Sequence, residues 1–316
     1  MTKEKRLLGA LELNRIYQMD CIEGMRLLPD DSVDLIVIDP PYNIGKDKRW
    51  DKWRSVEDYV AWMTEVFREC ERVLKPNGSF YWFHNDFEQI VELHRAIKEN
   101  TSFVFKQFIV WNKRFEGARN KGFLDGFVAA EGLRNYQQMA EYCLFYISNS
   151  FQKKLTESRK SLGMTENDVE LYIGRVEKKN PNRGTRICRR WEEGSSFPSE
   201  SDYEKLRNLF GWKESYDEIN TVFNNQKTHH SVWNYEVAPK IGHITPKPVE
   251  LIENIIRHSS NEGAIVLDCF MGSGTTAVAA TRLGRNFIGF EREPEYVKIA
   301  NQRLEMEALS DKEANQ

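Results

Sequence analysis

The sequence predicts an α/β protein built on a doubly wound, mostly parallel sheet with a helical insertion. Seven short apolar segments of strand length alternate with segments that repeat apolar residues at helical spacing. This alternation is typical of a parallel sheet that is covered by helices on both faces. The 316 residues, 40% of them hydrophobic and 29% charged, suffice for one large domain with an insertion or for two modest domains.

The predicted strands and helices follow one another from the N-terminal region onward. The strands are residues 15–20, 33–39, 79–83, 103–111, 141–147, 264–268 and 286–291. The helices are residues 22–28, 56–74, 87–98, 249–256, 275–283 and 294–309. The second of these helices is expected to stop at Pro76 and Gly78, which cannot continue a regular helix.

Two stretches interrupt the alternation. Residues 113–134 are rich in Gly, Arg and Lys and show no clear period, whereas residues 151–225 are polar and helical. We therefore expect a discontinuous α/β domain, 1–149 and 233–316, and a helical insertion at 150–232. The chain carries a net charge of −3, but residues 151–214 hold 14 Lys and Arg against 11 Asp and Glu. The insertion is thus the more plausible place for a polyanion to dock.

Composition excludes several classes of protein. No apolar run approaches the ~20 residues of a membrane span, and the N-terminal residues show no export signal, so a cytoplasmic location without a membrane partner is expected. The cysteines are scattered and form no C-x-x-C pair, which favours buried, reduced thiols over a metal site or disulfides. They are Cys21, Cys70, Cys143, Cys188 and Cys269.

The first motif is Asp39-Pro40-Pro41-Tyr42, directly after an apolar strand. Strand carboxyl ends face the ligand crevice of an open α/β sheet. The prolines fix the backbone and supply no N–H donors, so the Asp39 carboxylate and the carbonyl groups remain as acceptors beside the Tyr42 ring. This set suits a planar base with an exocyclic amine, which the acceptors bind and the ring stacks upon. An ordinary turn at the end of a strand fits the four residues equally well.

The second motif is the segment 268–276, DCFMGSGTT, between a strand and a helix. Gly272 and Gly274 allow a sharp turn and a close backbone approach at a helix N-terminus. Glu291 ends the next strand, 17 positions after Gly274, where dinucleotide folds place a ribose-binding acid. Ala277 stands at the third glycine position of G-x-G-x-x-G, which disfavours a dinucleotide and favours a nucleoside with a carboxylate tail, such as S-adenosylmethionine.

Together, and in this order, the two motifs resemble those of the β-class amino-methyltransferases of DNA. Residues 19–44 and the segment GHITPKP at 242–248 add further matches, and the resemblance covers residues 16–147 and 232–304. It implies a seven-stranded S-adenosylmethionine-dependent methyltransferase fold and methyl transfer to adenine N6 in duplex DNA by base flipping. It also implies that 1–149 and 233–316 form the catalytic domain and that 150–232 is a target-recognition insertion. Asp39 resembles adenine-N6 enzymes, since cytosine-N4 enzymes more often have Ser at that position. A cognate restriction endonuclease and a homodimer are conceivable partners of this class.

The resemblance also implies roles for individual residues. Asp39 and the Pro40 carbonyl would accept the adenine amine hydrogens, with Pro41 in the same turn and Tyr42 stacked on the base. Asp20 and Cys21 would meet the adenine edge of the cofactor, and Glu291 its ribose. The other cofactor-binding candidates are Asp39, His243, Thr245, Lys247, Asp268, Phe270, Gly272, Ser273, Gly274 and Thr275. Cys21 as a core residue and Lys247 as a solvated lysine are the alternatives.

The insertion carries a second resemblance, to Cro/repressor-type helix-turn-helix domains, in residues 155–174, 191–198 and 203–211. Its recognition helix would span 183–192. The sequence departs from the pattern, because Trp191 follows Gly174 by 17 positions and a basic loop replaces the short turn. The DNA-binding candidates are Arg183, Arg186, Arg189 and Arg190, together with Lys113, Arg114 and Arg119 from the irregular stretch. Support of the fold or a dimer contact is the alternative role for the insertion.

Three points stay open at the level of sequence. The loop 44–54 contains Trp50 and Trp53 among basic residues, and it either closes over an extruded base or packs its tryptophans on the core. A cytosine-N4 methyltransferase remains an alternative, as does a DNA-binding regulator on an inactive methyltransferase fold. An RNA or protein methyltransferase is disfavoured by the helix-turn-helix resemblance.

Overall fold

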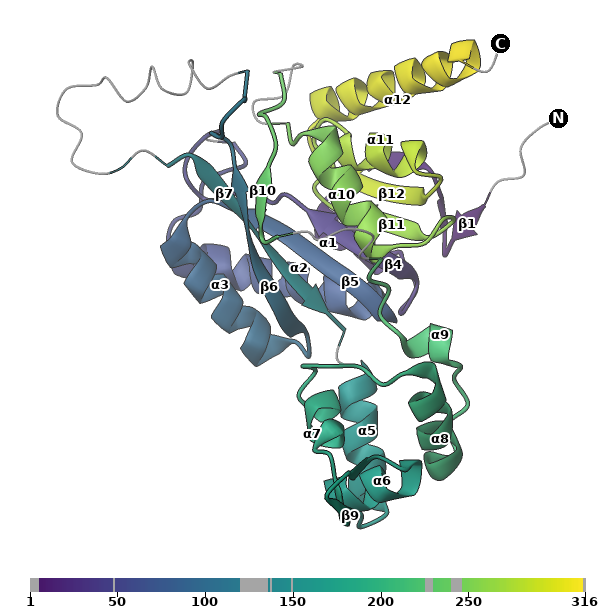
Figure 1. The fold of residues 1–316 in the computed structure, drawn as a ribbon. Helices are drawn as coiled ribbons and strands as arrows, with labels where there is room; N and C mark the ends of the chain where they lie inside the picture. Colours follow the sequence, from purple (N-terminus) through teal and green to yellow (C-terminus); the bar gives the residue numbers. More distant parts are fainter. Residues whose placement is uncertain are drawn as a thin grey trace.

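The computed structural model describes residues 6–47, 49–119, 136, 138–148, 150–224, 230–239 and 246–314, the last five by their backbone alone. In these ranges eight strands form one sheet (Figure 1). In spatial order they are β10 (Val232–Asn234), β6 (Val104–Asn112), β7 (Ala140–Ile147), β5 (Leu74–His84), β4 (Val33–Ile38), β11 (Ile265–Asp268), β12 (Asn286–Glu291) and β3 (Arg15–Gln18). Only β7 runs antiparallel to its two neighbours.

All seven predicted strands are present, but the prediction of a seven-stranded sheet is corrected to eight strands. The additional strand, β10, pairs in parallel with β6 at the sheet edge and begins at Val232. Three residues are too short a segment to show the period of a strand, so only pairing reveals it. A minor correction concerns residues 75–78, which open β5 directly after the helix instead of forming a separate turn.

Two sets of helices cover the two faces of the sheet, as expected of a doubly wound fold (Figure 1). One face packs against α1 (Cys21–Arg26), α2 (Val56–Val73) and α3 (Phe87–Asn100), and the other against α10 (Val249–Ser259), α11 (Thr275–Arg282) and α12 (Pro294–Ala314). The N-terminal residues add a short hairpin, β1 (Leu7–Leu8) with β2 (Leu11–Glu12). None of the helices in the described ranges is both long and apolar enough to cross a membrane.

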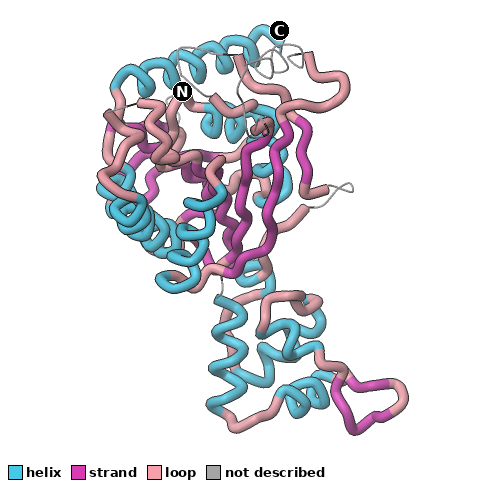
Figure 2. The backbone as a smooth tube through the Cα atoms, turned by 90° about the vertical axis from the view of Figure 1, so that its left-hand side faces the viewer, coloured by secondary structure: helices cyan, strands magenta, loops and turns pink. Residues whose placement is uncertain are grey.

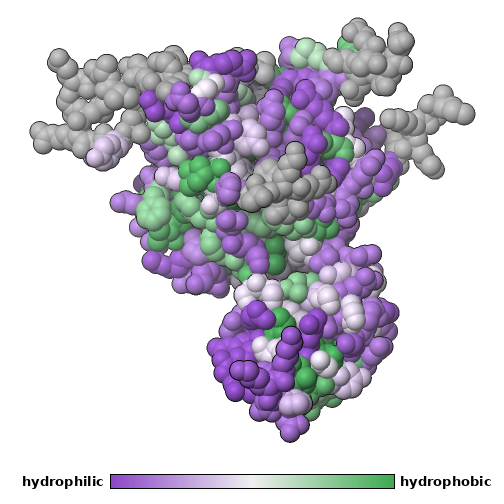
Figure 3. All heavy atoms as spheres, in the orientation of Figure 1, coloured by the Kyte–Doolittle hydropathy of each residue, from purple (hydrophilic) through white to green (hydrophobic). Residues whose placement is uncertain are grey.

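Residues 150–224 contain a group of short helices that we call the helical segment. It contains α5 (Ser150–Ser161), α6 (Glu166–Ile173), α7 (Ile187–Glu192), α8 (Glu200–Phe210) and α9 (Tyr216–Ile219), with a hairpin of β8 (Val176–Glu177) and β9 (Asn180–Gly184). Its apolar side chains, among them Leu155, Trp191 and Tyr203, form a core of their own. In Figures 1 and 2 it is a separate lobe, and in Figure 3 hydrophilic side chains cover much of its visible face.

The predicted recognition helix 183–192 is wrong in its first half. Arg183 lies on β9, and Arg186 precedes α7 with a φ of 62°, so the helix begins only at Ile187. The basic loop between Gly174 and Trp191 is a β-hairpin, an element that the helical period of the neighbouring residues concealed.

The helical segment joins the sheet on the side where the parallel strands begin, at their amino-terminal ends. It follows Ile147, which pairs with Val104 at the start of β6. Asn77 Nδ2 donates to the Asp217 carbonyl at 2.8 Å, and Lys106 Nζ donates to the Gly194 carbonyl at 2.8 Å. The carboxyl ends of the parallel strands therefore lie at the opposite edge from this lobe (Figure 1).

Candidate active site

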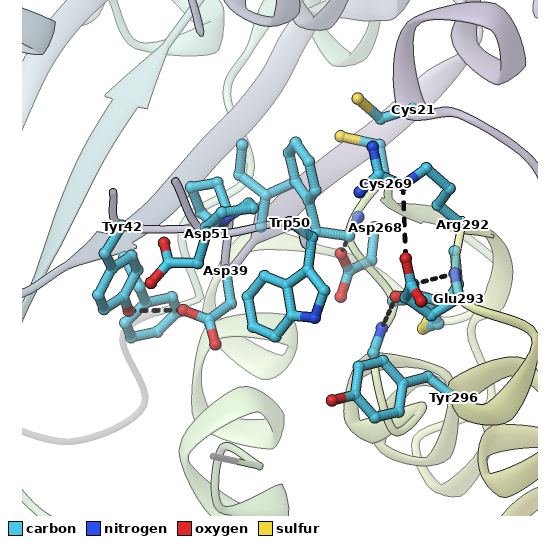
Figure 4. A pocket seen from close by; sticks show the side chains of 18 of the residues that line it. Cys21, Asp39, Tyr42, Trp50, Asp51, Asp268, Cys269, Arg292, Glu293 and Tyr296 are labelled. Carbon is cyan, nitrogen blue, oxygen red and sulfur yellow. Dashed lines mark hydrogen bonds and ion pairs between the residues drawn. The ribbon is translucent and has the colours of Figure 1, made fainter. Parts of the chain in front are cut away.

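A cavity of about 350 Å³ opens at the carboxyl ends of β4, β11 and β12. Both sequence motifs line it, although more than two hundred residues separate them in the chain. Figure 4 shows Asp39 and Tyr42 at one end of the cavity, Asp268 near its middle, and Glu293 and Tyr296 at the other end. The cavity thus has the position expected of a ligand crevice in an open α/β sheet.

The first motif forms a rigid turn after β4. The Tyr42 hydroxyl donates to Asp39 Oδ1 at 2.5 Å, and the Tyr59 hydroxyl donates to the Pro41 carbonyl at 2.7 Å. Burial, followed by the negative charge of Asp39, raises the pKa of Tyr42 well above its usual value. Among the described residues, no hydrogen bond reaches the Pro40 carbonyl. That carbonyl is therefore available to a ligand in the cavity.

Lys247 is the central cation of this end of the cavity. Its Nζ donates to Asp39 Oδ2 at 2.5 Å and lies 3.2 Å from Glu141 Oε2. The side chain is almost fully buried, which by itself lowers a lysine pKa, but the Asp39 and Glu141 carboxylates raise it above its usual value. Lys247 is therefore charged at neutral pH, and the prediction that it lies in the site is supported over that of a solvated lysine.

Glu141 completes a chain of buried charges with Lys247 and Lys113. It lies on β7 and accepts from Lys113 Nζ at 2.5 Å. Burial acts to raise the pKa of Glu141, yet Lys247 and then Lys113 outweigh it and hold this pKa at about 2. The four groups, Asp39, Lys247, Glu141 and Lys113, alternate in sign and balance to zero net charge. Such a chain fixes each side chain in position in a region of low dielectric.

The second motif forms a tight loop whose hydrogen bonds mostly join residues within the motif. Asp268 accepts from the Thr276 hydroxyl at 2.6 Å and from the Phe270 amide at 2.9 Å. Burial raises the pKa of Asp268 to about 7. Gly272 and Gly274 have φ angles of 52° and 81°. A Cβ on Gly274 would lie 2.8 Å from Ala300 Cβ, so this glycine is also required for the close packing of α12.

Acidic residues line the far end of the cavity. Glu291 accepts from the Gly272 amide at 2.8 Å, and burial raises its pKa. Asp20 caps α1 by accepting from the Ile22 amide at 2.9 Å, and the next residue, Cys21, is buried in the core while still lining the cavity. These carboxylates are the only acidic acceptors besides Glu293 among the described residues of this end. They suit the hydroxyl and amine donors of a nucleoside.

The loop 44–54 contacts both the cavity and the core. Asp51 is buried and organises the loop by accepting from the Asn43 and Lys46 amides at 2.6 and 2.8 Å. Trp53 packs on the core, with its ring centroid 4.8 Å from that of Tyr59. Trp53 also lines the cavity, as does Trp50, whose ring lies between Asp39 and Asp268 in Figure 4.

The structure brings together most of the predicted site residues. Those that line the cavity are Asp20, Cys21, Asp39, Pro40, Pro41, Tyr42, Lys247, Asp268, Phe270, Gly272, Ser273, Thr275 and Glu291. Gly274 belongs to the same loop, and His243 and Thr245 lie outside the described residues. Four of the predicted DNA-binding arginines, Arg183, Arg186, Arg189 and Arg190, lie on the helical segment at the opposite edge of the sheet.

The three basic candidates after β6 have different surroundings. Lys113 points inward to Glu141. Arg119 is exposed and forms an ion pair with Glu236 at 2.9 Å, and Arg114 is exposed too. The DNA-binding role predicted for Lys113, Arg114 and Arg119 stays a prediction.

Sequence reasoning missed Glu141 and Tyr296 as residues of the cavity. A signal for Glu141 was present, because it alternates with Cys143, Phe145 and Ile147 on the apolar face of β7. A carboxylate at a core position of a strand needs a buried partner, which marks it for a site. Tyr296 carried no such signal, since its position follows from how α12 packs.

Three comparisons with known proteins agree. A family model described as DNA methylase, for N6 and N4 methyltransferases, matches residues 33–302. Type II methyltransferase M1.MboII of Moraxella bovis is 32% identical, over 92% of this chain and 96% of that protein. DNA adenine methyltransferase YhdJ of Escherichia coli K12 is 30% identical, over 93% of this chain and 84% of that protein. The solved M1.HpyAVI–SAM complex is similar in fold, with a TM-score of 0.52 and 24% identity over 92% of this chain and 98% of that one.

Proposed function

This chain belongs to the N6/N4 DNA methylase family, and on that premise we propose that it transfers a methyl group from S-adenosylmethionine to adenine N6 in duplex DNA. The observation that carries the proposal is the cavity in which Asp39 and the Pro40 carbonyl lie beside a glycine loop and Glu291. The adenine-specific name of the relative YhdJ supports the choice of base. Duplex DNA is the proposed substrate.

The cavity fits the proposed cofactor. Its far end offers the Glu291 and Asp20 carboxylates to hydroxyl and amine groups, and its walls include the rings of Trp50 and Phe270. M1.HpyAVI, whose fold is similar, forms a complex with SAM. Such a cofactor supplies a methyl group already activated on a positively charged sulfur.

The part left to the protein is to bind and orient a weak nucleophile. The adenine amine donates its lone pair into the ring, so it attacks poorly unless its hydrogens are bound. Asp39 and the Pro40 carbonyl would accept those two hydrogens and increase the electron density on the nitrogen. Asp39 already accepts from Tyr42 and Lys247, but each carboxylate oxygen has a second lone pair for the base. The target base must leave the duplex to reach them.

Lys247 and Glu141 are proposed as positioning residues in this scheme. Lys247 holds Asp39 in one orientation, and Glu141 holds Lys247 from the other side. Orientation of the acceptors at near-attack geometry is a large part of the rate enhancement that an enzyme of this kind can supply. Tyr42 would stack on the base with its ring while its hydroxyl stays on Asp39.

Product analysis tests the proposal. The purified protein, S-adenosylmethionine and genomic DNA should yield N6-methyladenine, identified by mass spectrometry of the nucleosides. An RNA of matched length serves as the comparison acceptor. N4-methylcytosine as the sole product would establish the cytosine alternative, and RNA as the better acceptor would refute a DNA substrate.

The matched control is Asp39→Ala, which should remain folded and abolish the product. An inactive regulator would give no methylated nucleoside with either protein.

A further inference from the structure

The hairpin β8–β9 and the helix α7 carry a strongly basic surface. Between positions 175 and 190 the sequence contains seven Lys and Arg and one acidic residue, Glu177. Arg175, Arg183 and Arg189 form ion pairs within the helical segment. Lys178, Lys179 and Arg190 are exposed, and among the described residues none of the three forms an ion pair. We call Lys178, Lys179, Arg183, Arg186 and Arg190 the basic hairpin surface.

Buried polar contacts hold this surface in a fixed position. Glu170 is buried on α6 and accepts from the Cys188 amide at 2.8 Å and from the Thr185 hydroxyl at 3.2 Å. Asn167, also on α6, accepts from the Gly184 amide at 2.6 Å. The exit of the hairpin and the first turn of α7 are thus both anchored to α6. The basic side chains therefore project from a rigid scaffold rather than from a free loop.

The basic hairpin surface lies far from the proposed catalytic site. Lys106, which contacts the helical segment, lies on β6 five residues before Trp111, the strand partner of Glu141. At ~3.3 Å per residue this is about 17 Å. The 12 residues of α5 lead away from the sheet over about a further 18 Å. The hairpin protrudes at the end of the lobe farthest from the sheet (Figures 1 and 2).

A duplex that presents a flipped base to the cavity lies across the carboxyl ends of the strands, whereas the basic hairpin surface lies beyond the opposite edge. We propose that this surface binds a second length of duplex DNA, separate from the length that is methylated. This inference builds on the proposed function and replaces the predicted target-recognition role of the insertion. The net positive charge matches the phosphate backbone, and a two-stranded ribbon followed by a short helix has dimensions that the major groove admits.

The test separates the two DNA sites with one variant and one probe. The triple variant K178A/K179A/R190A removes three of the four exposed cations of this surface that form no ion pair among the described residues, and it leaves Arg186, which has a positive φ, unchanged. The probe is a fluorescent 24-base-pair duplex made only of G·C pairs, which offers no adenine to the cavity. The control variant R68A/R95A/K98A removes three cations from α2 and α3 on the main domain.

We expect the triple variant to bind the probe about tenfold or more weakly at low salt, with a salt dependence flattened by the loss of up to about three phosphate contacts. The control variant and Asp39→Ala should bind the probe like the wild type. The kcat of the triple variant at saturating genomic DNA should stay within about twofold of the wild-type value, because this variant changes no residue near the cavity.

Two results would overturn the proposal. Unchanged probe binding in the triple variant would show that the surface does not bind DNA. A kcat reduced together with probe binding, in a variant with an unchanged Tm, would place the segment in the catalytic complex. Failure of the proposed function is distinguishable from both, since the wild type would then form no N6-methyladenine in DNA while the probe still bound.

Discussion

The cavity and the helical segment use buried charges in different ways. At the cavity, Asp39, Lys247, Glu141 and Lys113 form a chain of alternating sign, and Asp39 keeps lone pairs for a ligand. In the helical segment the buried carboxylates Glu170 and Asp202 bind groups of the segment itself. Glu170 binds the start of α7.

Two further pairs in the segment follow the same rule. The pair Arg159–Glu192 joins α5 to α7, and Arg175–Asp202 joins the end of α6 to α8. The difference teaches that buried charge stabilises the architecture in the segment, whereas at the cavity it keeps acceptors in place for a reaction.

The strongest test of this contrast is Asp39→Ala. It removes the acceptor that we assign to the adenine amine, so kcat should fall by about 10²- to 10³-fold while binding of the G·C probe is unchanged. Tritiated methyl transfer to genomic DNA measures the effect. A variant with more than a tenth of the wild-type kcat would contradict the role of Asp39.

A second test compares Glu141→Gln with Glu170→Gln, one buried glutamate from each region. Loss of the Glu141 charge leaves Lys113 without its partner, so the free energy of unfolding should drop by about 3 kcal/mol and kcat should fall as well. Glu170→Gln should cost about 1 kcal/mol and leave kcat unchanged, because it acts only on the packing of α7. Denaturant unfolding and initial rates measure both. Equal effects on kcat would break the contrast.

The third test concerns the two tryptophans of loop 44–54. Trp50→Ala should weaken S-adenosylmethionine binding about tenfold, since a ring lining the cavity is lost. Trp53→Ala should weaken binding less than Trp50→Ala does and lower the unfolding free energy by about 2 kcal/mol, because its ring packs on Tyr59 and Trp62 besides lining the cavity. Calorimetric titration and thermal unfolding report the two quantities. The reverse pattern would exchange the assigned roles.

A fourth test is the pH dependence of stability at Asp268. Its folded-state pKa of about 7 lies above the usual 3.8, so its neutral form stabilises the fold fully below pH 3.8 and loses this effect as the pH rises to 7. In Asp268→Asn this loss disappears. The unfolding free energy of the variant relative to the wild type should therefore increase between pH 4 and pH 7. A difference that stays constant over this range would rule out the titration of Asp268.

Glu141 provides the opposite pH dependence. Its folded-state pKa of about 2 lies below the usual 4.5, so the stability that it contributes is present above pH 4.5 and is lost as the pH falls toward 2. Glu141→Gln should accordingly flatten the acid limb of the stability curve, which a denaturation series between these pH values measures. An acid limb of unchanged slope would show that the two lysines do not depress this pKa.

The sequence predicted every long strand of the sheet, because apolar runs and the turn residues that bound them are local properties of the chain. It also predicted that the two motifs form a ligand site, since each is a short segment whose residue types indicate which groups it can bind. It did not predict β10 or the hairpin β8–β9, because pairing with a distant or a nearby partner defines short strands. It did not predict the pairing of Lys113 with Glu141, since no local pattern shows which side of a strand end a lysine faces.

The order of the motifs Asp39–Tyr42 and 268–276, and with it the family, was thus determined by the sequence alone. The tertiary structure decided two further matters. It brought Glu141 and Lys247, which are more than a hundred positions apart, into contact with each other, and it placed Lys247 against the Asp39 carboxylate. It also placed the basic hairpin beyond the opposite edge of the sheet, because antiparallel β7 returns the chain to the edge where the parallel strands begin. Distances between segments depend on strand direction and pairing, and no single stretch of sequence contains them.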